Sequence, residues 1–320
     1  SIGHHYPLYL RMIITPYYLW KLRKKISCVD RFLIRSPSPL MFHFLRYLEP
    51  TRVTLYLVSD YLDNSKALYL PELRKKIIIL WIRNFQRKLL KNIPNYKVVS
   101  NSEELKIKFR SLNPNISIVK SSTLNASSFH EKLKPLAKPV ILLYTGRIDL
   151  SKGLIEMLDA IEILRSNGIS AKLRIAGWDT NSAYRNEKAI IAHAKNLNLE
   201  DALELLGKKK IGLELNEVYR EADIFILYSQ YSEGFPRSIW EAMANSTPVI
   251  ASCVGSIPHF LENDKHALVI EPRNALCLAQ SIQRVVESKN LRETLVRNGY
   301  HLAKNNTLIG QARKLMDKIQ

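Results

Sequence analysis

Cysteine is scarce in this chain, and two short motifs that mark common classes of enzyme are missing. The 320 residues include only three cysteines, Cys28, Cys253 and Cys277, and none of them forms a C-x-x-C pair. This pattern argues against a zinc site and favours a reducing compartment. The sequence has no G-x-G-x-x-G, which excludes a dinucleotide-dependent dehydrogenase. It has no compact Asp-x-Asp either, so we expect no divalent metal bound by that device.

Long apolar runs are also missing. No stretch approaches the roughly 18 apolar residues that a membrane-spanning helix needs, and no charged, then apolar, then small-residue leader opens the chain. The hydrophobic content of 46% is ordinary for a globular protein. At 320 residues the chain exceeds the size that one hydrophobic core usually serves, so we expect two domains.

Acidic residues are few in the first part of the chain. Residues 1–137 hold 24 Lys and Arg against 8 Asp and Glu, whereas the remainder holds 24 against 21. Within this basic part, segment 74–91 places Ile78, Ile82, Phe85 and Leu89 on one helical face. Such a helix either packs on an internal sheet or lies on an anionic membrane surface. Even in the first case, the basic residues could hold this part of the chain against an anionic membrane, at about 1 kcal/mol for each basic residue near the surface. No nucleic-acid-binding module accompanies the charge, so nucleic acid is not an expected partner.

The most informative segment contains two glutamates eight positions apart, Glu233 and Glu241. It reads as a strand, a loop, a helix and a further strand, which is one unit of an α/β sheet. Gly234 lets backbone amides approach a ligand, and Pro236 suits the first turn of the helix. Free amides at a helix start favour an anion. A bare pair of glutamates at this spacing is usually structural, but the surrounding residues favour a binding site.

A second motif lies upstream, in residues 139–164. It reads as a buried strand from Val140 to Tyr144, a turn that carries Arg147 and Lys152, and a helix with apolar residues at 3.6-residue periodicity. A guanidinium and an ammonium group at a helix start can stabilise the growing charge of a diphosphate leaving group. Alone, these two residues would more often be solvated charges of a turn. Their position before the glutamate unit favours phosphate binding.

Together the two motifs resemble the G-R-x5-G and E-x7-E elements of the retaining glycosyltransferases of family 4, which have the two-domain GT-B fold and use nucleotide-activated sugars. The resemblance implies that Glu233 orients the transferred sugar and that Arg147 and Lys152 hold the donor phosphates, and these three are the expected catalytic residues. It also implies that Glu241 binds the nucleotide ribose. The expected donor-binding residues are Gly146, Arg147, Lys152, Gly177, Gly207, Gly234, Phe235, Pro236 and Glu241. No metal and no cofactor beyond the nucleotide sugar is expected.

The alternation of strands and helices from residue 139 to 286 predicts about six βα units and a parallel sheet covered on both faces. The expected fold is therefore α/β, with two Rossmann-like parallel-sheet domains in the GT-B arrangement. Residues 1–137 are expected to form a partial acceptor-side domain, residues 138–304 the nucleotide-sugar domain, and residues 305–320 a helix that returns to the first. The first clear strand lies near Arg31, so we expect the N-terminal domain to lack its opening strand and glycine-rich loop. Arg35 falls where many relatives place a histidine near the acceptor. His259 stands where a glutamate is common, and a surface position is expected for it.

The resemblance predicts transfer of a hexose-type sugar from a nucleotide diphosphate sugar to an acceptor hydroxyl. The acceptor is expected in a bacterial polysaccharide or lipid-linked glycan, at the cytoplasmic face of the membrane. Two alternatives stay open: a sugar-nucleotide epimerase of the same fold, and a non-catalytic remnant that binds nucleotide. If the opening elements are lacking, the chain is expected to bind a nucleoside diphosphate but to transfer sugar poorly.

Overall fold

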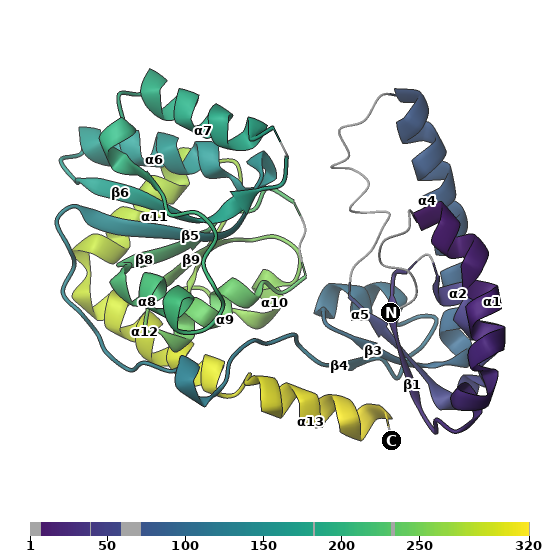
Figure 1. The fold of residues 1–320 in the computed structure, drawn as a ribbon. Helices are drawn as coiled ribbons and strands as arrows, with labels where there is room; N and C mark the ends of the chain where they lie inside the picture. Colours follow the sequence, from purple (N-terminus) through teal and green to yellow (C-terminus); the bar gives the residue numbers. More distant parts are fainter. Residues whose placement is uncertain (1–7, 39, 59–71, 182, 232–233, 320) are drawn as a thin grey trace. The chain divides into compact units, whose positions relative to one another are not determined.

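A computed structural model describes residues 8–38, 40–58, 72–181, 183–231 and 234–319. The chain divides into two compact units, Ser1–Lys120 with Ala312–Gln320, and Ser121–Gln311. Each unit contains its own parallel sheet (Figure 1). The domain limits expected at residues 137 and 304 stay a prediction.

The first unit is built on a four-stranded parallel sheet in the order β1-β2-β3-β4. Three of these strands were predicted from the sequence, and they are confirmed, whereas the short β4 and the first helix were not predicted. Helix α4 packs Ile82, Phe85 and Leu89 into the interior, as one of the two alternatives for this segment predicted. The elements are α1 (Leu8–Ser27), β1 (Phe32–Ser36), α2 (Met41–Leu45), β2 (Val53–Leu57), α4 (Glu72–Asn92), β3 (Lys97–Ser100), α5 (Glu103–Phe109) and β4 (Ser117–Ile118).

The second unit is built on a six-stranded sheet in the order β10-β9-β8-β5-β6-β7, with every pair parallel. This sheet confirms the predicted series of βα units. Its strands are β5 (Val140–Ile148), β6 (Ala171–Asp179), β7 (Leu203–Leu205), β8 (Ile224–Leu227), β9 (Val249–Ser252) and β10 (Leu268–Ile270). The helices are α6 (Leu154–Ser166), α7 (Arg185–Asn196), α8 (Leu213–Glu221), α9 (Arg237–Ala244), α10 (Ile257–Phe260), α11 (Ala275–Glu287) and α12 (Lys289–Lys304). Helix α13 (Leu308–Ile319) begins in this unit, and its residues from Ala312 onward belong to the first unit.

The order of the strands places a topological switch point between β5 and β8. From β5 the chain continues outward through β6 to β7, and from β8 it continues in the other direction to β10. Helices α6 and α7 lie above the sheet in the view of Figure 1, and α8, α9 and α12 lie below it. Every residue of β8 and β9 is buried, as expected for strands covered on both faces. In open α/β sheets, ligands bind outside the carboxyl ends of strands at such a switch point.

Candidate active site

Strand β5 extends to Ile148, beyond the end at Tyr144 expected from the sequence, so Arg147 lies in the last part of the strand and not in the turn. Lys152 ends the short turn that follows. The hydroxyl of Tyr144 donates to the carbonyl of Arg147 at 2.8 Å and supports the turn from below. Asp149 caps the short 3₁₀ turn Leu150–Lys152, and its carboxylate accepts from the amide of Ser151 at 2.9 Å. Burial raises the pKa of Asp149, but the hydrogen bonds from Ser151 and the nearby cations outweigh it, so the pKa lies below its ordinary value. These bonds fix the backbone of the turn and so the positions from which Arg147 and Lys152 project.

A glycine is required where this turn meets the next helix. Gly153 has φ of +70°, and a Cβ there would lie 2.3 Å from the carbonyl oxygen of Tyr228. Both observations exclude a larger residue without movement of the backbone. Gly153 belongs to the sequence element that suggested a phosphate-binding turn, and its role is conformational.

Strands β5 and β6 approach each other closely beside this turn. Gly146 and Gly177 are partners in register, and the amide of Gly177 donates to the carbonyl of Gly207 at 2.9 Å. A Cβ on Gly177 would lie 1.9 Å from the carbonyl oxygen of Gly146. Three of the glycines expected at the donor site are therefore neighbours at one edge of the sheet.

Glu241 reaches the same region from helix α9. This helix begins at Arg237, and Pro236 is its N-cap in extended conformation. The proline therefore precedes the first turn by one residue, because its ψ of 128° lies outside the helical region. The Glu241 carboxylate accepts from Thr123 Oγ1 at 2.6 Å and from the Tyr219 hydroxyl at 3.0 Å.

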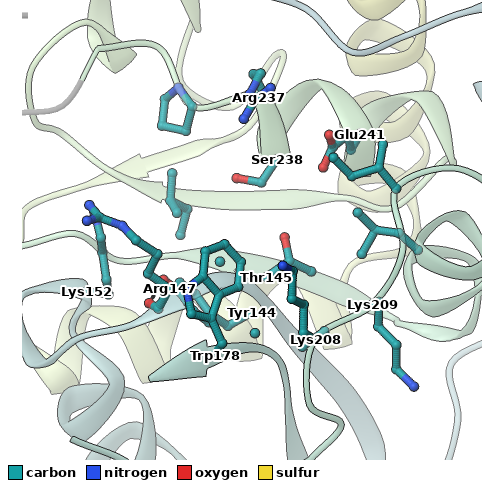
Figure 2. Close-up of a pocket in the computed structure, with 17 residues that line it drawn as sticks. Tyr144, Thr145, Arg147, Lys152, Trp178, Lys208, Lys209, Arg237, Ser238 and Glu241 are labelled. Atoms are coloured by element: carbon teal, nitrogen blue, oxygen red, sulfur yellow. Dashed lines mark hydrogen bonds between the residues drawn. The ribbon is translucent and has the colours of Figure 1, made fainter. Parts of the chain in front are cut away.

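These elements surround one cavity of about 530 Å³. Figure 2 shows the residues of α9 facing those of β5 and β6 across it. Six residues expected from the sequence line the cavity: Gly146, Arg147, Lys152, Gly177, Pro236 and Glu241. Further lining residues that sequence reasoning missed include Thr145, Trp178, Lys208, Lys209, Arg237 and Ser238.

Four expected residues are not among those that line the cavity. Glu233 lies outside the described residues. Gly207 contributes through its carbonyl to the neighbouring strand end. The ring of Phe235 is buried and stacks on Trp240 with ring centroids 4.3 Å apart, so this side chain belongs to the core. Gly234 and Phe235 remain candidates through their backbone amides only.

Basic side chains dominate the cavity. Arg147, Lys152, Lys208, Lys209 and Arg237 line it, and Glu241 is the one acidic lining residue among those described. The ammonium group of Lys208 lies 5.2 Å from the ring centroid of Trp178. Lys209 has a partner outside the lining, Glu214, at 3.7 Å. An excess of positive charge in a concave site favours an anionic ligand such as a diphosphate.

The remaining sequence expectations have mixed outcomes. His259 is exposed on α10, as expected. Arg35 lies in the first unit and lines a separate, largely apolar cavity of about 510 Å³. Over the described residues, no group of three His, Cys, Asp or Glu side chains is arranged to hold a metal ion. The expectation that the reaction uses no metal stays a prediction.

Two parallel-sheet units, with a basic cavity at the switch point of the second, define a protein of the GT-B fold. A glycosyltransferase from Rickettsia africae has the same fold, with a TM-score of 0.74, 20% identity, and coverage of 99% of this chain and 82% of its own. HepE of Anabaena, solved with UDP, also has a TM-score of 0.74, at 13% identity over 97% of this chain and 81% of its own.

Sequence comparison gives the family. The family described as glycosyl transferases group 1 matches residues 126–302, which is more than half of the chain, and the chain belongs to this family. Mannosylfructose-phosphate synthase of Agrobacterium fabrum is 28% identical over 185 residues, 56% of this chain and 40% of that protein. The putative colanic acid biosynthesis glycosyltransferase WcaL of Escherichia coli is 29% identical over 158 residues, 47% of this chain and 37% of that protein. The chain thus spans well under two thirds of the length of these two relatives.

Proposed function

We propose that this protein is a retaining glycosyltransferase that transfers a sugar from a nucleoside diphosphate sugar to an acceptor hydroxyl. One observation carries the proposal. Arg147 and Lys152 from β5 and its turn converge with Glu241 from α9 on a single basic cavity at the switch point. Membership of the group 1 glycosyltransferases supports the same chemistry.

In the proposed reaction, the bond between the anomeric carbon and the phosphate oxygen breaks, and its electron pair stays with the diphosphate. The acceptor oxygen attacks the same face of the sugar, and its proton passes to the departing phosphate, so the anomeric configuration is retained. Arg147 and Lys152 stabilise the charge that grows on the diphosphate. Glu233 orients the sugar, and the amides of Gly234 and Phe235 cap the phosphates.

The acceptor is proposed from the names of relatives. WcaL is named for colanic acid biosynthesis, and TuaC of Bacillus subtilis, 31% identical over 163 residues, is named as a putative teichuronic acid biosynthesis glycosyltransferase. Both names refer to bacterial polysaccharides. We therefore propose a polysaccharide or lipid-linked glycan acceptor. The hexose-type donor is proposed from the resemblance of the two motifs to those of family 4.

Donor binding is tested by thermal unfolding in the presence of a panel of nucleotide sugars. A ligand at 100 times its Kd stabilises a folded protein by about 2.7 kcal/mol. The nucleotide sugar that raises the Tm clearly is therefore taken as the donor. The stabilising donor is then incubated with and without glycan acceptors. Transfer to an acceptor with retained configuration supports the proposal, and inversion overturns the retaining mechanism. An altered free sugar nucleotide from donor alone identifies an epimerase, and binding without turnover identifies a non-catalytic protein.

We also propose that the first unit binds anionic membrane surfaces from the cytoplasmic side. No helix in the described ranges has the length and apolarity to cross a membrane. Yet helix α4 exposes Ile77 and Leu80 at 62% and 69%, and helix α1 exposes Trp20 at 57%. The cation of Arg23 stacks over the Trp20 ring, 4.8 Å from its centroid. Exposed apolar and aromatic side chains beside basic ones are typical of interfacial helices.

Cosedimentation with vesicles tests this surface. Vesicles containing phosphatidylglycerol are expected to bind the protein, whereas vesicles of phosphatidylcholine alone are not. Replacing Trp20 and Leu80 by serine is expected to weaken binding without changing nucleotide affinity, because both residues lie in the first unit. Equal binding to the two vesicle types would contradict the electrostatic part of the proposal.

A further inference from the structure

The carboxylate of Glu241 is held by two hydroxyl groups that the proposed reaction does not use. Thr123 Oγ1 donates to one carboxylate oxygen at 2.6 Å, and the Tyr219 hydroxyl donates to the other at 3.0 Å. The Tyr219 hydroxyl also lies 2.6 Å from Thr145 Oγ1. Thr145 immediately precedes Gly146 on β5, and Tyr219 lies on α8. The cluster therefore joins β5, α8, α9 and the segment before β5 around one carboxylate.

The direction of these hydrogen bonds follows from the chemistry of the groups. An ionised carboxylate only accepts, so the single proton of Tyr219 goes to Glu241, and Thr145 donates to Tyr219. Tyr219 is fully buried. Burial, followed by the charge of Glu241, holds the pKa of Tyr219 well above its ordinary value, so the phenol stays a neutral donor.

We propose that Tyr219 and Thr123 are positioning residues that hold the Glu241 carboxylate in place for the ribose hydroxyls of the nucleotide. Each carboxylate oxygen can accept about two hydrogen bonds. Thr123 and Tyr219 occupy one position on each oxygen, which leaves one position on each for the ribose 2′- and 3′-hydroxyls. The inference rests on the proposed function, since it needs a nucleotide in this cavity.

Fixing the carboxylate before the ligand arrives lowers the cost of binding. A glutamate side chain has three rotatable bonds, and ordering them on binding costs conformational entropy. The hydrogen bonds from Thr123 and Tyr219 order the Glu241 side chain when the protein folds, so ligand binding does not have to order it. Thr145 extends the arrangement to the strand end, where Gly146 and Arg147 line the cavity. The same network therefore holds the ribose-binding carboxylate in register with the proposed phosphate-binding turn.

The test replaces each donor by its closest non-donor, as Tyr219→Phe and Thr123→Val. The probes are UDP and GDP and their 2′,3′-dideoxy counterparts, titrated by calorimetry. Whichever diphosphate binds the wild type is expected to bind each variant about tenfold more weakly, in line with the loss of one hydrogen bond to a charged group. The dideoxy nucleotide has no ribose hydroxyls to donate to Glu241. The wild type and both variants are therefore expected to bind it with the same affinity as one another.

Tyr228→Phe is the matched control. Tyr228 is as buried as Tyr219, and its hydroxyl donates to backbone carbonyls of Glu271 and Asn274 rather than to the cavity. Its variant is expected to lose thermal stability, as Tyr219→Phe does, but to keep the affinity of the wild type for UDP or GDP.

Three outcomes would count against the inference or its basis, and they are distinguishable. If the wild type binds neither UDP nor GDP, the proposed nucleotide site itself is wrong. If the wild type binds and Tyr219→Phe and Thr123→Val bind equally well, the hydroxyl groups do not position Glu241. If the variants lose the same factor for the dideoxy nucleotide, their effect is a general distortion of the cavity, and the positioning role is overturned.

Discussion

Gly177→Ala provides the most direct test of how the second unit builds its cavity. Gly177 lies on β6 opposite Gly146 of β5, and its Cβ would fall 1.9 Å from the carbonyl oxygen of Gly146. Cβ contacts under 3.0 Å are essentially never found in proteins. The two strand ends must therefore separate by roughly 1 Å to accept one methyl group. The strand end that moves carries Arg147.

The magnitude follows from two separate costs. Overpacking of this kind costs about 1–3 kcal/mol, and stabilities of folded domains are about 5–15 kcal/mol, so the variant is expected to fold with a Tm lowered by several degrees. Displacing a substrate-positioning group by about 1 Å can cost on the order of 10²-fold in rate. The loss of kcat/KM is therefore expected to exceed by far what the fraction of unfolded protein explains.

The assay combines thermal unfolding, UDP or GDP titration and turnover on the same preparation. Gly299→Ala is the matched control, because the nearest neighbour of its Cβ would be the flexible side chain of Met243 at 3.0 Å, with the carbonyl oxygen of His266 at an ordinary contact distance of 3.5 Å. Alanine also favours a helix over glycine by about 1 kcal/mol. The control is expected to keep its stability and its nucleotide affinity. Wild-type affinity and turnover in Gly177→Ala would refute the link between this glycine contact and the proposed donor site.

Three further predictions address single side chains. Arg147→Ala and Lys152→Ala are each expected to lower kcat roughly 10²-fold with little change in Tm, because both act on leaving-group charge; activity within a few-fold of wild type would remove the phosphate role. Glu241→Gln is expected to weaken nucleotide binding in the ground state, whereas Glu233→Gln is expected to lower kcat mainly, and equal UDP or GDP affinity of Glu241→Gln and wild type would contradict the ribose role. Burial lowers the pKa of Lys120 from 10.5 to about 8. Between about pH 8 and pH 10.5 the unfolded chain holds a proton on Lys120 that the folded chain has lost, so the stability of the wild type rises with pH in this range. Lys120→Met removes the cost of burying the charge and is expected to raise the Tm at pH 7. Above about pH 10.5 the lysine is neutral in both states, so this advantage is expected to disappear.

The sheet and part of the site were predictable because their signals are local in the sequence. Arg147 and Lys152 lie within one strand end and its turn, and Glu241 lies on the helix of the next motif. Parallel strands in a doubly wound sheet bring their carboxyl ends to the same edge. Once the strands are assigned, residues that follow them must meet, and the cavity confirms that these three do.

The partners of Glu241 could not be predicted in this way. Thr123 is 118 residues away in the sequence, and Tyr219 lies on a helix where a buried tyrosine reads as an ordinary core residue. No spacing relates either residue to the glutamate. For Phe235 the motif was misleading in the other direction. It placed the residue at the site, whereas its ring packs on Trp240 in the core. Short motifs therefore indicate backbone position better than the environment of a side chain.

The charges of the cavity explain why binding and chemistry are expected to be linked here. A nucleoside diphosphate gains negative charge when it separates from the sugar, and the lining carries five cations against Glu241. Some of this charge is already engaged, since Lys208 lies over Trp178 and Lys209 lies near Glu214. In the proposed reaction, Arg147 and Lys152 hold the diphosphate, so we expect their attraction to strengthen as charge moves onto the departing phosphate. We therefore expect this pair to lower the barrier of the proposed reaction, and the other cations of the lining to bind donor and product more nearly alike.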